Sequence, residues 1–258
     1  MSRNTSQVIL ATGELYPKFD LKPGMILLGA ESQPLALKGV ETRRVPAFEV
    51  KPQKSESFLV GLDQKILAMS KTNEPLLLPA KDYVEFSANL QQKFSLAKAI
   101  LDFPESELPL DPYFQGLLLG NDKSDTKFIP KQYLFADKKS RQALLAGLLD
   151  TDGYLAGRYY DFKTSSQQLA DDIAFLARSL GLTVFENRHP KTSGCVARLY
   201  IHGDFSEIPI RIRRKISSVS RQYFERFTIK PAGIQGIQYL DIESYLLGDC
   251  TIRIGDHI

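Results

Sequence analysis

The stretch LLAGLLDTDGYL, residues Leu144 to Leu155, predicts a helix with one smooth, apolar face. Its leucines recur at helical spacing with Ala146 and Gly147 between them, so a second helix can approach this face closely. Gly153 ends the helical run. We therefore expect the chain to be organised around a helix pair that includes this stretch.

Two acidic residues lie near the end of the predicted helix. Asp150 and Asp152 fall in its last turn, where the helix macrodipole disfavours negative charge. Their position requires a compensating cation or a functional reason. A divalent metal is one natural compensator, because Mg²⁺ binds one or two carboxylates together with phosphate oxygens and water.

The nine residues Leu145 to Gly153, LAGLLDTDG, resemble the signature motif of the LAGLIDADG homing endonucleases. The flanking segments Lys127 to Ala143 and Ser165 to Glu186 look like those around the second such motif in intein-borne endonucleases. The resemblance implies an α+β fold with an inserted αββαββα domain. It also implies double-stranded DNA as the partner and Mg²⁺-dependent hydrolysis of phosphodiesters as the activity.

A second segment, DPYFQGLLLGND (Asp111 to Asp122), resembles the first motif helix of that family, and its small residues would pack against the helix of Leu145 to Gly153. The segment departs from the family in two ways. The carboxylate position falls on Asn121, and Asp122 stands where a glycine is usual. Only Lys123 to Thr126 then separate it from the next family segment, so the first repeat is expected to be largely deleted.

The resemblance assigns roles to individual residues. Asp152 would hold Mg²⁺, with Asp122 as a second candidate ligand, and Lys127 would stabilise the charge that develops on the phosphate. Because Asn121 replaces one acid and two DNA strands need two active sites, we expect a nicking or inactive enzyme. The alternative is a catalytically inactive relic that acts as a nucleic-acid-binding or structural subunit of a larger assembly, with a protein partner.

The two chain ends resemble another part of the inteins. Residues 1–75 read as short strands in the order of the N-terminal splicing half, and Ile237 to Ile254 resemble the closing strands. We expect a degenerate, all-β splicing (Hint-like) domain from residues 1–75 and 226–258, and an endonuclease-like domain from residues 76–225. Within the latter, NLQQKFSLAKAILDF at residues 89–103 predicts a helix.

Protein splicing itself is not expected. The family register places Met1 at the nucleophilic cysteine and Gln64 at the activating histidine. Methionine has no ionisable thiol and glutamine has no titratable imidazole, so neither can support acyl transfer. Ile254 and Gly255 replace the terminal His-Asn pair, and His257 stands alone beyond them.

Nucleic-acid contacts are expected from two regions. A strand pair after Gly153 is predicted to direct Arg158, Tyr160 and Lys163 toward one DNA-facing side. A basic cluster between Ile208 and Lys230 would bind phosphates, with an affinity that falls steeply as salt rises. The candidates in this cluster are Arg211, Arg213, Arg214, Lys215 and Arg221. For both regions the alternative interpretation is a solvated surface.

Composition is that of a globular protein. The 258 residues are 43% hydrophobic and 24% charged, with a net charge of +3. No apolar run approaches the ~20 residues needed to cross a bilayer, so no membrane association is expected. The N-terminus lacks the apolar core of a secretory signal, which predicts an intracellular protein of the cytoplasm or nucleus. Cys195 and Cys250 lie in no zinc-binding pattern.

Overall fold

The computed structural model describes residues 7–53, 55, 57–122, 124, 126–188, 197–215 and 225–256. It divides the chain into two compact units. Unit 1 consists of Met1–Ala99 and Phe224–Ile258, and unit 2 of Ile100–Tyr223. The named strands pair antiparallel and helices are few, so the fold is of the expected α+β class. No helix within the described ranges is both long and apolar enough to span a membrane.

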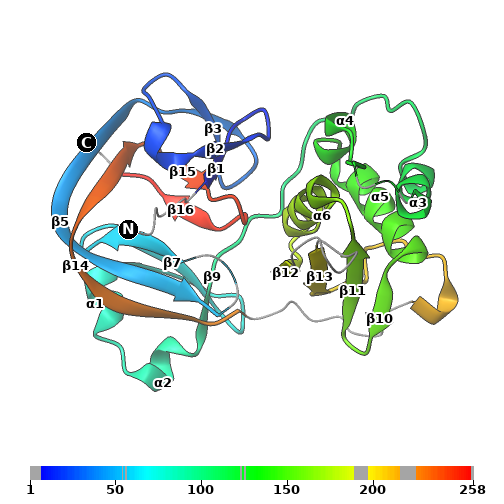
Figure 1. Ribbon diagram of the computed structural model, residues 1–258. Coiled ribbons are helices and arrows are strands. Elements are labelled where there is room, and N and C mark those ends of the chain that lie inside the picture. The colour runs from blue at the N-terminus through cyan, green and yellow to red at the C-terminus, as the bar shows by residue number, and fades with distance from the viewer. Residues whose placement is uncertain are drawn as a thin grey trace. The chain divides into compact units, whose positions relative to one another are not determined.

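Unit 1 is built around a sheet to which both ends of the chain contribute. The long strand β5 (Gly39–Pro52) lies between β14 (Phe227–Asp241) and β6 (Phe58–Gly61), and β5 and β14 run side by side in Figure 1. The other elements of this unit are β1 (Gln7–Ile9), β2 (Leu15–Pro17), η1 (Lys18–Asp20), β3 (Ile26–Leu28), β4 (Pro34–Ala36), β7 (Lys65–Ser70), β8 (Pro75–Pro79), α1 (Ala80–Val84), α2 (Ala88–Gln91), β9 (Phe94–Leu96), β15 (Ser244–Leu246) and β16 (Ile252–Ile254).

Residues 76–99 belong to unit 1, whereas the sequence assigned them to the inserted domain. Strands β8 and β9 both pair with β7, so this segment completes the three-stranded sheet β8-β7-β9. The helix predicted over residues 89–103 was wrong for the same reason. Helix α2 ends at Gln91, because Phe94–Leu96 pairs with Ala68–Ser70 and tertiary pairing overrides the local helical pattern.

Unit 2 contains a helix pair and a four-stranded sheet. Its elements are α3 (Pro112–Asn121), α4 (Lys131–Leu134), α5 (Lys138–Thr151), β10 (Tyr154–Ala156), β11 (Tyr159–Thr164), α6 (Gln167–Ser179), β12 (Thr183–Arg188), β13 (Ala197–His202) and η3 (Arg213–Lys215). The strand order is β10-β11-β13-β12, and α6 packs against the last three of these strands (Figure 1). The strand pair predicted after Gly153 is confirmed by β10 and β11.

The helices α3 and α5 touch through their backbones. A Cβ atom added at Gly116 would lie 2.3 Å from the carbonyl oxygen of Leu144, and one added at Gly147 would lie 2.1 Å from that of Tyr113. Real side chains do not make contacts this short, so glycine is required on both sides. The expected pairing of the two small-residue helix faces is therefore confirmed.

Alanine at the contact should drive the two helices apart. We expect Gly147→Ala to lower the free energy of unfolding by about 1–3 kcal/mol through overpacking, although alanine is the better helix former. Leu118→Ala is the control, because Leu118 is exposed on α3 and should cost less than about 0.5 kcal/mol. Chemical denaturation of the two variants measures the difference, and equal stability would contradict the backbone contact.

Candidate functional site

Helices α3 and α5 end next to each other. A Cβ added at Gly120, in the last turn of α3, would lie 2.5 Å from the Cβ of Thr151 at the end of α5. Asp122 is the C-cap of α3 and Asp152 is the C-cap of α5. Both residues are exposed. Two carboxylates are thus held at the same end of one helix pair, although each is close to a helix terminus that disfavours negative charge.

Lys127 compensates for the charge at the end of α3. Its side chain is buried, and Nζ donates to the carbonyl oxygens of Leu119 at 3.2 Å and Asp122 at 2.5 Å. The last carbonyls of a helix lack helical partners and carry partial negative charge, so an ammonium group is favourable there. Lys127 was predicted to act on the scissile phosphate; the structure directs two of its three donors to the helix end.

Lys215 does the same for α5. Its Nζ donates to the carbonyl oxygens of Leu149 at 3.0 Å, Asp150 at 2.8 Å and Thr151 at 3.3 Å. The ammonium therefore provides the compensating cation that the acidic end of this helix requires. The sequence placed Lys215 in a phosphate-binding cluster and gave no sign of this contact, because the lysine lies in η3, far from the helix along the chain.

Asp150 is a structural residue. Its carboxylate is buried and accepts three hydrogen bonds, from the Tyr113 hydroxyl at 2.9 Å and from the backbone N–H groups of Arg211 at 2.8 Å and Ile212 at 3.1 Å. Burial and the hydrogen bond to Asp150 raise the pKa of Tyr113. The carboxylate joins α3, α5 and the segment before η3, and its oxygens are occupied by protein donors.

The chemistry of Asp122 and Asp152 is compatible with a magnesium ion that also takes ligands from phosphate and water. Asp122 Oδ1 accepts a hydrogen bond from Ser124 N at 2.8 Å, which fixes its orientation. Within the described part of the chain, no three His, Cys, Asp or Glu side chains gather closely enough to form a complete metal cage. The carboxylates therefore fit Mg²⁺ only as a partial ligand set.

The sheet of unit 2 has an outer face that is rich in aromatic rings. Tyr159 stacks on His202 at a centroid distance of 4.8 Å and meets Tyr200 edge-on at 5.8 Å, while Phe185 lies 4.9 Å from His202. Lys163 is exposed on the same face. The sequence interpretation missed these rings. The signal was available, because aliphatic residues alternate with Arg198, Tyr200 and His202 along β13, which places these three side chains on one face.

An ion pair neutralises the acid on this outer face. Asp161 on β11 is buried, and its two carboxylate oxygens accept hydrogen bonds from Arg198 Nε on β13 at 2.8 and 3.0 Å. Arg198 Nη2 also contacts Asp161, and its guanidinium lies 5.2 Å from the ring centroid of Tyr200. The hydrogen bond to Asp161 raises the pKa of Arg198. The pair therefore leaves no uncompensated carboxylate on the described outer face.

Tyr160 was expected on the DNA-facing side, and this prediction was wrong. Its ring is buried against Phe205, its hydroxyl donates to the Lys215 carbonyl oxygen, and burial raises its pKa to about 12. Side chains alternate along a strand, so Tyr160 and Lys163 point to opposite faces. Arg158 is exposed in the turn between β10 and β11, as a DNA-contacting residue would be.

The basic cluster is only partly a free surface. Arg213 is exposed in η3, which also includes the backbone of Arg214. The Arg211 guanidinium lies 3.6 Å from the ring centroid of Tyr113, so it packs on α3 while remaining exposed. Arg221 lies outside the described residues.

The positions that would carry splicing chemistry are occupied by structural contacts. Gln64 is buried, accepts from Gly61 N at 3.1 Å and donates to Asp256 Oδ2 at 2.9 Å. A Cβ at Gly255 would lie 1.7 Å from the carbonyl oxygen of Ile242, so this backbone cannot accommodate an asparagine there. Met1 and His257 lie outside the described residues.

The middle of the chain is similar to known proteins. The family described as "Homing endonuclease" matches residues 129–198, from just before α4 into β13. The replicative DNA helicase DnaB of Mycobacterium intracellulare is 48% identical over 65 residues, which are 25% of this chain and 10% of the helicase. The protein is therefore homing-endonuclease-like in this region, and it matches only a small part of the length of that helicase.

Substitution of Asp150 in α5 and of Asp152 at its C-cap should have very different effects on the free energy of unfolding. We expect Asp150→Asn to lower the free energy of unfolding by about 1–3 kcal/mol, because the new amide group cannot accept all three hydrogen bonds. Asp152→Asn, at the exposed end of the same helix, should change it by less than about 0.5 kcal/mol. Urea titrations at neutral pH measure both, and a reversed order would refute the structural role of Asp150.

Proposed function

We propose that this chain is a DNA-binding protein that descends from an intein-borne homing endonuclease of the LAGLIDADG type. The family match at residues 129–198 carries the proposal, because it spans α5 and most of the four-stranded sheet. The identity to a segment of a replicative helicase supports the intein origin. The β5–β14 pairing, which joins both chain ends, fits a Hint-like domain that no longer splices.

The outer face of the unit 2 sheet is the surface that we propose for duplex DNA. Phosphate contacts supply affinity, and Lys163 and Arg158 are exposed cations at this sheet. The aromatic side chains Tyr159, Tyr200 and His202 offer flat and hydrogen-bonding groups for sugars and base edges. Because Arg198 already pairs with Asp161, the acid on this face should not repel phosphate.

Hydrolysis, where it survives, is proposed to use the shared end of α3 and α5. Asp152 and Asp122 would hold a magnesium ion, which when bound would polarise a phosphodiester and lower the pKa of water. Lys127 and Lys215 fix the two helix ends and place positive charge beside both aspartates. Asn121 provides an amide oxygen where the family has a carboxylate, so the second strand should be cut poorly or not at all.

A second candidate function is a non-catalytic subunit that binds another protein. Phe114 and Leu118 are 54% and 59% exposed on α3, four residues apart and therefore on one helix face. The described residues leave more than half of each of these side chains exposed, as expected if the first repeat is deleted. An exposed apolar face of this kind is typical of a protein-binding surface.

Cleavage is tested with supercoiled plasmid and Mg²⁺ or Mn²⁺. We expect nicked product from the intact protein and at least about a 100-fold lower rate for Asp152→Asn, since the metal would lose a charged ligand. Equal nicking by both proteins would show that Asp152 is not the metal ligand. No product with retained DNA binding would favour the non-catalytic alternative.

DNA binding is tested by fluorescence anisotropy across a salt series. Lys163→Gln should weaken binding uniformly across sequences and reduce the slope of log K against log salt by about 1, because one phosphate contact is lost. Lys81→Gln is the matched control, since Lys81 is equally exposed but lies in unit 1. The sheet assignment would be wrong if the Lys81 variant lost affinity and the Lys163 variant did not.

A further inference from the structure

Arg198, on the outer face of the unit 2 sheet, is held in one orientation by Asp161. Its Nε donates to both carboxylate oxygens of Asp161, at 2.8 and 3.0 Å, and its Nη2 also donates to Oδ2. The guanidinium therefore meets the carboxylate along its Nε edge. Asp161 is 7% exposed and lies on the neighbouring strand β11, so the sheet itself fixes the position of this acceptor.

The far end of the same guanidinium is available to a ligand. Nη1 makes no hydrogen bond to a described residue, and Nη2 carries a second hydrogen atom besides the one directed at Asp161. The Arg198 side chain is 38% exposed. Two parallel N–H donors at the end of an arginine match the O6 and N7 acceptors that guanine presents in the major groove of a duplex.

The neighbours of Arg198 across the sheet are polar and carry no negative charge. In the strand register, Arg198 lies between Lys163 on β11 and Asn187 on β12, and both of these side chains are exposed. The ring centroid of Tyr200 lies 5.2 Å from the Arg198 guanidinium, which adds an aromatic contact to the ion pair. This row of the sheet therefore presents donors from three adjacent strands to a bound duplex.

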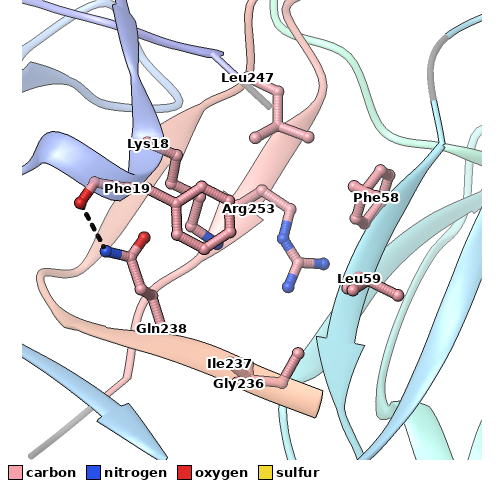
Figure 2. Close-up of a pocket in the computed structure, with 9 residues that line it drawn as sticks. All are labelled: Lys18, Phe19, Phe58, Leu59, Gly236, Ile237, Gln238, Leu247 and Arg253. Carbon is pink, nitrogen blue, oxygen red and sulfur yellow. Dashed lines mark hydrogen bonds between the residues drawn. The ribbon is translucent and has the colours of Figure 1, made fainter. Parts of the chain in front are cut away.

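Other arginines of the chain are held as firmly but cannot reach a ligand. Arg141 is fully buried in unit 2, where its Nη2 donates to the carbonyl oxygen of Leu101. Arg253 is 2% exposed, and Figure 2 shows its guanidinium among the apolar side chains that line a pocket of unit 1. Arg198 combines a fixed orientation with an exposed end, and base recognition requires both.

We propose that Arg198 reads a guanine in the major groove of DNA, with Asp161 as its positioning residue. This inference rests on the proposed function, because it assigns a base contact within the same outer sheet face. Nη1 and Nη2 donate to O6 and N7 of the guanine, while Nε and Nη2 stay paired with Asp161. Adenine presents an amino donor in place of O6, so it would face one of the two arginine donors with another donor.

The test begins with a pool of DNA duplexes that contain a randomised central window. The fractions bound by the intact full chain and by Arg198→Lys are sequenced. The lysine keeps the positive charge beside Asp161, so the variant should fold, but it lacks the planar fork. We expect guanine enrichment to disappear at one position of the bound sequences and to persist elsewhere. Arg178→Lys is the matched control, because Arg178 lies on α6 and pairs with Glu186, and its enrichment should match that of the intact chain.

A chemical substitution in the DNA then tests the contact itself. At the position identified, 7-deazaguanine, which lacks the N7 acceptor, replaces guanine in an otherwise unchanged duplex. Fluorescence anisotropy should show an affinity loss of at least about fivefold for the intact chain and of less than about twofold for Arg198→Lys. If Arg198→Lys does not fold, Asp161→Asn should reduce the guanine preference at the same position, because the amide orients the guanidinium less firmly.

The outcomes separate this inference from the proposed function. Three results would overturn the guanine contact while leaving DNA binding intact: no guanine enrichment by the intact chain, equal enrichment by the intact chain and Arg198→Lys, or an equal loss of affinity on 7-deazaguanine substitution for both. An Arg198→Lys variant that loses affinity uniformly for all duplexes would reassign Arg198 to phosphate. Failure of the intact chain to bind any duplex would refute the proposed function, and this inference with it.

Discussion

The backbone contact between α3 and α5 is the constraint on which unit 2 depends. Gly116 and Gly147 bring the two helices closer than any side chain would allow, so the chain segments that follow both helices begin at one place. This closeness fixes where Asp122 and Asp152 lie relative to each other. A metal or phosphate at this end of the helices would meet groups from both, although neither helix alone carries a site.

The adjacent ends of α3 and α5 also determine the charge distribution around them. Two helix C-termini side by side concentrate partial negative charge, and the two aspartates add more. One lysine compensates at each helix end, Lys127 at α3 and Lys215 at α5. The further acid, Asp150, is buried, and its carboxylate is stabilised by three hydrogen bonds. Both ammonium groups bind carbonyl oxygens at the helix ends, so their role in the structure is to stabilise the helix pair.

Much of this could be predicted from the sequence, because glycine spacing and strand alternation are local patterns. The helix pair and the strand pair after Gly153 were found in that way. Features that depend on long-range contacts could not be predicted in this way. The segment around Phe94, which was predicted to be helical, is a strand because it pairs with β7. Tyr160 is buried because of the face of β11 on which it lies. The contact of Lys215 with α5 depends on a path of the chain that no local pattern encodes.

Hydrogen exchange of the full chain, with and without a long duplex DNA, tests the central claim most directly. If the outer face of the sheet binds DNA, amides of β11 and β13 and of the turn at Arg158 should exchange more slowly in the complex, while β5 and β14 stay unchanged. Protection confined to unit 1, or none in unit 2 under conditions where the duplex is bound, would contradict it.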